Sequence, residues 1–336
     1  MRPEAVSVGV APVRAERHWD ASAPRDTVRT VTTVIETMQL TKSYGGRRGV
    51  EAVDVSVAEG EVFGFLGPNG AGKTTTIRCL LGALRPTSGR SEIFGLDCWL
   101  QAPTIHRRLS FLPSDPGYLG ELTAAEQLGH IAALRGLAST TWQHLAERLE
   151  LDPTVQIRRL SRGNRQKVGV VAAFMGEAPL LVMDEPTTGL DPLIQREFLR
   201  LVAEAKTAGR TVFLSSHNLP EIERSCDRVA IIRDGRIVRV SPVQELVGSH
   251  WRSVNLVLAE AAPAGTFDLP NVRVVSADAR DVHLMVLGEV NPLLRTIAGL
   301  DVRDIAITTP DIEDIFLRFY DGHAEPEAHD PPEAAP

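Results

Sequence analysis

Short apolar runs alternate with helical patterns over much of the chain. Largely apolar stretches at residues 62–66, 180–183 and 211–214 predict buried strands, because half-exposed strands alternate apolar with polar residues. Apolar residues at helical spacing occupy residues 192–206 and 219–226. Strands that alternate with helices in this way predict an α/β domain with a parallel sheet.

A second set of patterns predicts an antiparallel part beside this core. Residues 34–40, 51–57 and 91–95 predict further strands, and residues 41–46 predict a turn. Residues 229–238 predict a hairpin, because two apolar runs flank Asp234-Gly235 and Asp-Gly favours a tight hairpin turn.

Helical signals prevail between residues 97 and 178. Thr123 and Glu126 have the spacing of a capping box, and a helical pattern follows them to residue 137. Residues 140–143 repeat the signal, with leucines behind them. We therefore expect a mostly helical insert, at about residues 97–178, inside the α/β domain.

The pattern changes again after residue 248. Expected strands at 254–258, 272–275, 282–287 and 302–307, with helices at 292–298 and 311–319, predict a small α+β domain over residues 249–320. Residues 1–33 show no steady period and predict a flexible leader, or an overlong start assignment. The acidic, proline-rich residues 321–336 predict a disordered tail. The main domain is thus expected at residues 34–248.

Composition narrows the function classes. The net charge is −7 without a dense basic run, which argues against nucleic acid as the main partner. Cys79, Cys98 and Cys226 have no metal or redox spacing and predict reduced thiols. No stretch reaches the roughly 18 apolar residues needed to span a bilayer. Any membrane role is therefore expected to go through a partner.

The strand at 62–66 leads into a phosphate-binding loop. The following residues have the pattern Gly-x-x-x-x-Gly-Lys-Thr and open a helix. Glycines let the backbone wrap a phosphate, and the helix N-terminus adds partial positive charge. We expect Lys73 to reach the β- and γ-phosphates and Thr74 to ligate Mg²⁺. The expected nucleotide-binding residues are Gly67, Pro68, Asn69, Gly70, Ala71, Gly72, Lys73, Thr74 and Thr75.

Two carboxylates end the apolar strand at 180–183. Asp184 is expected to hold the metal directly or through water, and Glu185 to orient or deprotonate the attacking water. Acidic residues at a strand end are common, but the phosphate-binding loop upstream favours the catalytic interpretation.

Residues 160–166, with the sequence Leu-Ser-Arg-Gly-Asn-Arg-Gln, open another helix with Ser161 as a plausible N-cap. These residues lie between the phosphate loop and the acidic strand. In sequence and position they resemble the LSGGQ signature of ATP-binding cassette (ABC) ATPases. The acidic strand resembles the Walker B motif of that family, residues 188–191 its D-loop and His217 its switch histidine. Tyr44 resembles the aromatic residue that stacks on adenine, although a turn tyrosine can also pack on the sheet.

Further details resemble export-type ATPases that pair with ABC-2 permeases, including drug and natural-product efflux subunits. These details are Pro-Asn-Gly-Ala-Gly-Lys-Thr-Thr in the loop, Asn-Arg-Gln-Lys-Val in the signature and residues 312–317. The resemblance implies a cytoplasmic, MgATP-hydrolysing subunit held at the inner face of the cell membrane by a separate permease.

The same resemblance implies a head-to-tail homodimer around two ATP molecules. Each ATP would lie between the phosphate loop of one subunit and the signature of the other. The residues that would act across the dimer are Ser161, Gly163, Asn164 and Asp191. His217 would sense the γ-phosphate and position water, so the implied catalytic residues are Lys73, Glu185 and His217.

Two departures from the family pattern stand out. Ser114-Asp115 occupies the place of the Q-loop glutamine, so Asp115 or, more weakly, Ser114 is a candidate oxygen ligand for the metal or water; an exposed turn is the alternative. Arg162 and Asn164 replace Gly and Gln in the signature, whereas Ser161 and Gly163 are retained.

Two other functions remain open from sequence. A soluble ABC ATPase acting on nucleic acid or ribosomes usually has long coiled coils or tandem cassettes, and this chain has neither. A non-catalytic, nucleotide-gated regulator is disfavoured by the Asp184-Glu185 pair and by His217.

Overall fold

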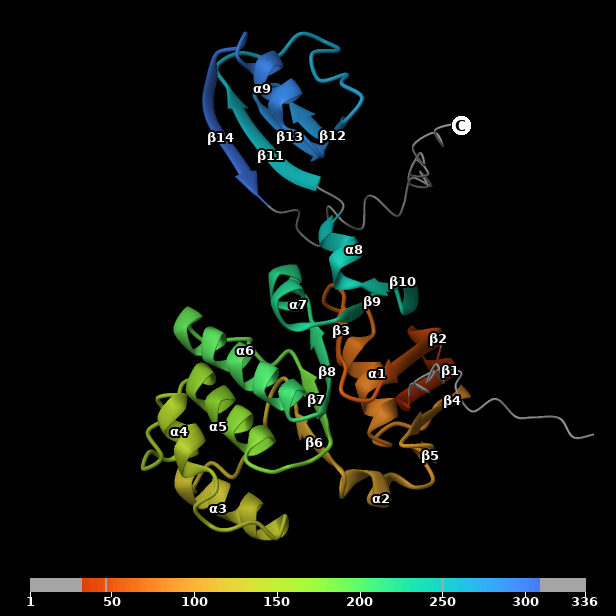
Figure 1. Cartoon of the computed structure of the whole chain (residues 1–336), viewed down its shortest axis with the longest axis vertical. Coiled ribbons are helices and arrows are strands. Elements are labelled where there is room, and N and C mark those ends of the chain that lie inside the picture. Colours follow the sequence, from red (N-terminus) through yellow and green to blue (C-terminus); the bar gives the residue numbers. More distant parts are fainter. Residues whose placement is uncertain (1–31, 46, 249–250, 309–336) are drawn as a thin grey trace, which may run out of the picture. The chain divides into compact units, whose positions relative to one another are not determined.

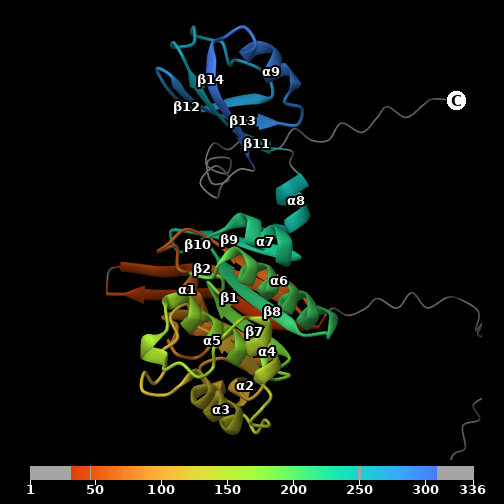
Figure 2. The ribbon, with the colours of Figure 1, turned by 90° about the vertical axis from the view of Figure 1, so that its left-hand side faces the viewer.

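The computed structural model describes residues 32–45, 47–248 and 251–308. The expected leader lies outside these residues except for its last two positions, and Thr33 is the first residue of a strand. The expected closing helix at 311–319 and the tail at 321–336 also lie outside them. Figures 1 and 2 show residues 32–248 and residues 251–308 in two views.

A six-stranded sheet with the order β10-β9-β3-β8-β7-β6 forms the centre of residues 32–248 (Figure 1). Five strands are parallel and β10 is antiparallel to β9. The carboxyl ends of β3, β6, β7 and β8 therefore lie along one edge of the sheet. The strands are β3 (Val62–Leu66), β6 (Leu109–Leu112), β7 (Leu180–Asp184), β8 (Thr211–Ser216), β9 (Arg228–Arg233) and β10 (Arg236–Pro242).

An antiparallel sheet with the order β2-β1-β4-β5 accompanies the central sheet. Its strands are β1 (Thr33–Tyr44), β2 (Arg47–Ala58), β4 (Ser88–Ile93) and β5 (Leu96–Asp97). The turn expected at 41–46 is wrong for most of its length, because β1 continues to Tyr44, which pairs with Arg47. Pairing with β2 outweighs the local turn signal.

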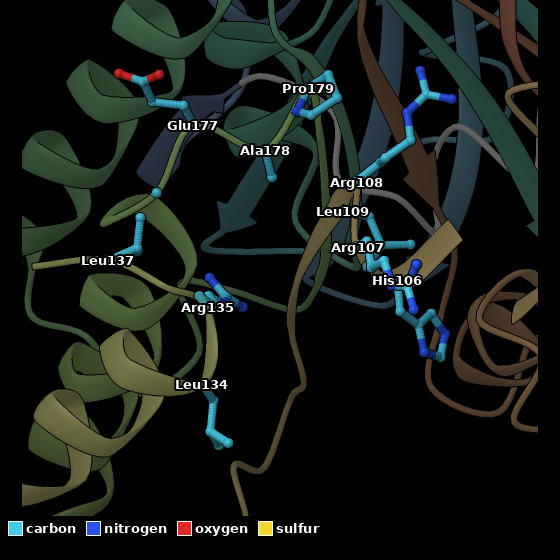
Figure 3. Close-up of a pocket in the computed structure, with 11 residues that line it drawn as sticks. His106, Arg107, Arg108, Leu109, Leu134, Arg135, Leu137, Glu177, Ala178 and Pro179 are labelled. Atoms are coloured by element: carbon cyan, nitrogen blue, oxygen red, sulfur yellow. The ribbon is translucent and has the colours of Figure 1, made fainter. Parts of the chain in front are cut away.

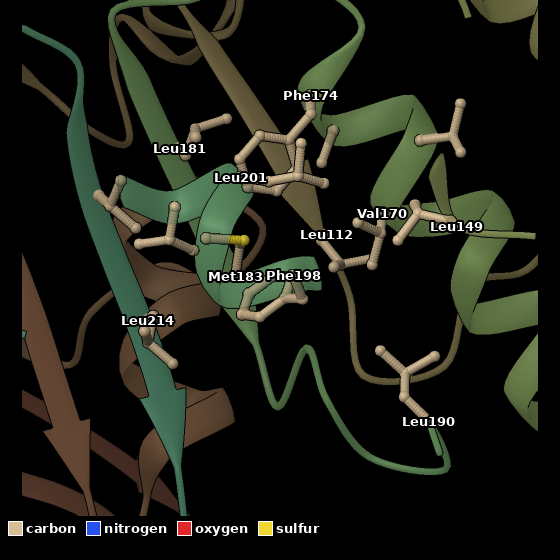
Figure 4. Close-up of a cluster of buried hydrophobic side chains, with 14 of the residues drawn as sticks. Leu112, Leu149, Val170, Phe174, Leu181, Met183, Leu190, Phe198, Leu201 and Leu214 are labelled. Atoms are coloured by element: carbon tan, nitrogen blue, oxygen red, sulfur yellow. The ribbon is translucent and has the colours of Figure 1, made fainter. Parts of the chain in front are cut away.

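Two hydrophobic cores cover the two faces of the central sheet. Side chains alternate across each strand, so Phe63 and Phe65 of β3 join one core while Val62 and Leu66 join the other. The first core also holds β1, β2 and α1 (Lys73–Leu80). Figure 4 shows part of the second core, where side chains from sheet and helices interlock. The helices in this core include α3 (Ala124–Leu134), α4 (Gln143–Arg148), α5 (Arg162–Phe174), α6 (Pro192–Thr207) and α7 (Leu219–Ser225).

The expected helical insert at 97–178 is more mixed than its sequence pattern suggests. It begins with α2 (Ala102–His106) and then contributes β6 to the central sheet, where β6 pairs with β7. The helices beyond β6 are α3, α4, the 3₁₀ turn Ile157–Arg159 and α5. The Thr123 capping box is confirmed, because Thr123 and Glu126 bond each other's backbone N–H groups.

Residues 251–308 form a four-stranded antiparallel sheet with the order β12-β13-β11-β14. Its elements are β11 (Trp251–Leu258), β12 (Val272–Asp278), β13 (Asp281–Leu287), α9 (Asn291–Ile297) and β14 (Val302–Thr308), while α8 (Val243–Gly248) precedes them. Each described strand and helix expected in this region is present. The buried apolar side chains form a hydrophobic cluster of their own, between Val254 and Val302. We therefore propose that residues 249–320 are a separate domain.

Candidate functional site

The phosphate-binding loop follows β3 at the carboxyl edge of the sheet. The Gly67 N–H donates to the Ser216 carbonyl at 3.1 Å, which ties the start of the loop to the end of β8. Gly72 has a φ of 110°, and a Cβ there would lie 2.6 Å from Val50, so only glycine fits. The first N–H groups of α1 have no partner within the helix, and Gly72 provides no side-chain cap. The loop thus presents backbone donors to an anion.

Lys73 is the charged group of the loop and is only 5% exposed. Its Nζ donates to the carbonyls of Gly67 at 2.6 Å and Pro68 at 3.1 Å. The same atom lies 3.2 Å from Glu185 Oε1, in an ion pair. The sequence prediction that Lys73 and Glu185 serve one site is consistent with this contact.

Thr74 and Asp184 lie together, although 110 residues separate them in the chain. The Thr74 hydroxyl donates to Asp184 Oδ2 at 2.8 Å, and the Ser215 hydroxyl donates to Asp184 Oδ1 at 2.6 Å. Mg²⁺ prefers hard oxygen ligands and usually takes one or two from protein, with phosphate and water oxygens completing its shell. A hydroxyl and a buried carboxylate therefore fit the expected ion.

Ser215 is a site residue that the sequence interpretation missed. It orients Asp184, and its carbonyl accepts the Glu185 N–H at 3.1 Å. The available signal was its position, because it lies near the end of a buried strand just before His217.

Glu185 connects three parts of the site. Its Oε2 lies 3.2 Å from His217 Nδ1 and accepts the Thr188 hydroxyl at 3.3 Å, while its Oε1 faces Lys73. Its φ of 49° is unusual for a residue with a side chain, and such conformations persist where surrounding contacts hold them. The His217 side chain is 47% exposed, so it borders solvent next to the Glu185 carboxylate, which can accept a hydrogen bond from a water molecule.

Tyr44 and Asp115, the remaining sequence candidates, occupy different surroundings. Tyr44 ends β1, is 45% exposed and has the Lys42 ammonium 5.5 Å from its ring centre. Its ring packs against Gly49, whose carbonyl in turn lies close to Gly72 of the phosphate loop. Asp115 is exposed just beyond β6, and within the described ranges it makes no hydrogen bond or ion pair with Thr74, Asp184 or Glu185. Its role as a metal ligand stays a prediction.

The signature segment is fixed to the loop that follows Glu185. Ser161 caps α5 by accepting the Asn164 N–H at 3.2 Å, as expected. A Cβ on Gly163 would lie 2.4 Å from the Gly189 carbonyl, so glycine permits this close approach. Buried Gln166 donates to the Pro186 carbonyl at 3.0 Å.

Asp191 caps α6 by accepting the N–H groups of Leu193 and Ile194, and the Ile194 hydrogen bond is the main cause that lowers the pKa of its carboxyl. No hydrogen bond among the described residues joins Ser161, Gly163, Asn164 or Asp191 to residues 67–75.

A separate cavity of about 650 Å³ lies away from these residues (Figure 3). Its lining comes from residues 106–109, 134–135, 137 and 176–179, which places it at the amino ends of β6 and β7. The nucleotide-binding residues lie at the opposite ends of these strands, so this cavity is not the nucleotide site.

Comparison with known proteins agrees with this geometry. The family model described as "ABC transporter" matches residues 50–188. The chain is 35% identical to the bacitracin transport ATP-binding protein BcrA of Bacillus licheniformis, over 87% of this chain and 99% of the relative. It is 32% identical to the daunorubicin resistance ATP-binding protein DrrA3 of Streptomyces coeruleorubidus, over 83% of this chain and 93% of the relative.

Solved structures share the fold of the main domain. An ATP-binding subunit of an ABC transporter has a TM-score of 0.59 and 32% identity, and the match covers 64% of this chain and 92% of that one. A dimeric ATP-binding cassette in a post-hydrolysis state with ADP and Pi has a TM-score of 0.58 at 21% identity, with coverage of 62% and 98%, and supports the fold alone. The chain therefore belongs to the ATP-binding proteins of ABC transporters, and it is an ATP hydrolase with the P-loop α/β fold of that family.

Proposed function

We propose that this ATP hydrolase energises a membrane exporter by driving a separate permease of the ABC-2 type. The observation that carries this proposal is the match to a bacitracin transport protein, which spans 305 residues and is therefore longer than the main domain alone. A second relative carries daunorubicin resistance in its name. These names favour transport over the alternative function on nucleic acid or ribosomes.

The residues of the site divide the hydrolysis reaction among them. Lys73 and the loop N–H groups bind and neutralise the β- and γ-phosphates. Thr74 and Asp184 would hold Mg²⁺, with Asp115 as a further candidate, and the ion would supply positive charge to the phosphate oxygens. Glu185 orients the attacking water and accepts its proton, and His217 positions that water beside Glu185. Tyr44 is assigned to stacking on adenine.

Two copies of the chain complete each site. Among the described residues of one chain, no hydrogen bond joins the signature residues to the phosphate loop. A partner's α5 N-terminus, with Ser161, Gly163 and Asn164, can close the open side of the γ-phosphate, because helix N-termini favour anions. Asp191 of the partner borders the same interface. ATP then favours a head-to-tail dimer, and hydrolysis removes that preference.

The permease is the partner that converts this closure into transport. No helix in the part of the chain that the structure describes is long and apolar enough to cross a membrane. We place the chain on the cytoplasmic face of the membrane, held there by the permease.

Isolation of the tagged chain from native membranes tests this assignment. A partner with several membrane spans should co-purify with it and should stimulate or regulate its ATP hydrolysis. Ribosomes or DNA in place of such a partner would overturn the exporter assignment.

The small domain, residues 249–320, is proposed to brace the dimer. Its position after a complete nucleotide-binding domain and its separate core support this role. Removal of residues 249–336 should weaken ATP-dependent dimers in sedimentation experiments, and an unchanged dimer would contradict the proposal.

A further inference from the structure

Glu221 on α7 is a buried carboxylate beside the site. It has no role in the ATP hydrolysis proposed for Lys73, Glu185 and His217. The side chain is only 8% exposed, and its Oε2 accepts the Ser216 hydroxyl at 2.5 Å. Its Oε1 is also buried and has no hydrogen-bond partner among the described residues. The carboxyl is therefore half satisfied.

Burial of the Glu221 carboxyl with one unpaired oxygen lowers the stability of the folded chain. Burial raises the pKa of Glu221, and the hydrogen bond from the Ser216 hydroxyl offsets only part of that effect. A buried polar group with an unpaired oxygen costs stability that an apolar side chain of similar size would not. We therefore expect Glu221 to contribute by holding a neighbouring group in position.

Ser216, the partner of Glu221, braces both sides of His217. Its hydroxyl accepts the Asn218 N–H at 2.9 Å, immediately after the histidine. Its carbonyl accepts the Gly67 N–H at 3.1 Å, at the start of the phosphate loop. Asn218 is the N-cap residue of α7, and its own side chain makes no capping hydrogen bond. The Ser216 hydroxyl is thus the side-chain anchor of this turn.

We propose that Glu221 is a positioning residue that holds His217 beside Glu185 by fixing the Ser216 hydroxyl. The Glu221–Ser216 hydrogen bond orients that hydroxyl, so that its lone pair faces Asn218 N–H and sets the backbone that carries His217. The His217 side chain is about half exposed, so little packing around it fixes its position. The position of its backbone therefore decides whether His217 Nδ1 reaches Glu185 Oε2, which lies 3.2 Å away. The proposal rests on the role proposed above for His217.

The test compares steady-state ATP hydrolysis of the full chain with and without His217. Glu221→Leu should lower kcat about tenfold or more and leave KM for ATP within about twofold, because only positioning for the chemical step is lost. Glu221→Gln should recover most of the activity, since its amide oxygen can still accept the Ser216 hydroxyl. Glu223→Leu is the matched control, on the same helix and half-buried, and should leave kcat unchanged.

The double variant decides the mechanism. In a His217→Ala background, Glu221→Leu should cause little further loss, because residues that act as one unit are not additive. Equal losses in both backgrounds would overturn the proposal. A loss of activity in Glu221→Leu, when His217→Ala alone has no effect, would also overturn the proposal, and that result would refute the role of His217 as well.

Ser216→Ala provides a second route to the same measurement, with the same expected non-additivity. Thermal unfolding should show that Glu221→Leu is at least as stable as the unmodified chain, and marked destabilisation would favour a structural role.

Discussion

At the scale of single residues, Glu185 contacts both Lys73 and His217. One carboxylate oxygen faces Lys73 and the other faces His217 and Thr188. The Glu185 backbone has a positive φ of 49°. This arrangement fixes where a water molecule can be oriented and deprotonated.

Glu185→Gln should abolish turnover while leaving nucleotide binding intact. Glutamine keeps the shape and one acceptor oxygen but cannot accept a proton, so kcat should fall at least about 100-fold. A phosphate-release assay measures the change, and the exposed Glu177→Gln at the opposite edge of the sheet serves as control. Hydrolysis at the normal rate would show that Glu185 is not the catalytic carboxylate.

Lys73→Ala should weaken nucleotide binding. Loss of charge-assisted hydrogen bonds to phosphate, each worth about 1.5–3 kcal/mol, predicts at least a tenfold weaker Kd for ATP by calorimetry. Lys206→Ala, a substitution on α6 and outside the phosphate-binding loop, should leave the Kd unchanged. Equal affinity of the Lys73→Ala variant would count against the phosphate-binding role of the loop.

The buried Glu221 should make stability depend on pH. Burial raises its pKa in the folded state above the usual 4.5, so the folded chain retains this proton as pH rises past 4.5 whereas the unfolded chain loses it. The stability contribution of Glu221 is thus highest below pH 4.5 and declines as pH rises through the raised pKa. Urea unfolding of the chain and of Glu221→Gln should show the unmodified chain losing stability relative to the variant as pH increases. A constant difference would contradict the buried, pKa-raised state.

At the scale of elements, the edge formed by the ends of β3, β7 and β8 assembles the site. Strong local patterns made these strands predictable, because each is a continuous apolar run followed by a polar motif. The capped helix starts at Thr123 and Ser161 were also predictable, since a cap depends on residues three positions apart.

Features that depend on distant pairing were not predictable in the same way. β6 has four residues and no distinctive period, and its place in the sheet is set by β7, about 70 residues later. The residues at the end of β1 have the local pattern of a turn, and their register with β2 has no local signal. Ser215, Gln166 and Glu221 act through partners remote in sequence or buried, so their residue types alone did not mark them.

Arg148 joins α4 to α6 and offers a test at this scale. Its guanidinium bonds Glu197 at 2.6 Å and pairs with Glu204 through two hydrogen bonds of 2.7 and 2.8 Å. Arg148→Met should lower the free energy of unfolding by about 1–2 kcal/mol, between the values for surface and buried ion pairs. Chemical denaturation measures this change, and Arg200→Met, which removes a more exposed partner of Glu197, should cost much less. Similar decreases in the free energy of unfolding in both variants would show that the ion pairs of Arg148 with α6 stabilise the fold no more than an exposed ion pair does.

At the scale of the whole molecule, no hydrogen bond among the described residues of one chain joins the signature residues to the phosphate loop. The phosphate loop, Glu185 and His217 lie at one edge, while the signature helix is anchored by Gly163 and Gln166 to the loop after Glu185. That anchoring gives a physical route by which the state of one nucleotide site can affect the signature presented to a partner chain. The proposed head-to-tail dimer uses both halves.

Sedimentation velocity of the full-length Glu185→Gln variant, with and without MgATP, tests this central claim most directly. Bound ATP that is not hydrolysed should hold two copies together, so the variant should sediment as a dimer with MgATP and as a monomer with MgADP or without nucleotide. A variant that binds MgATP by calorimetry and still sediments only as a monomer would contradict the account.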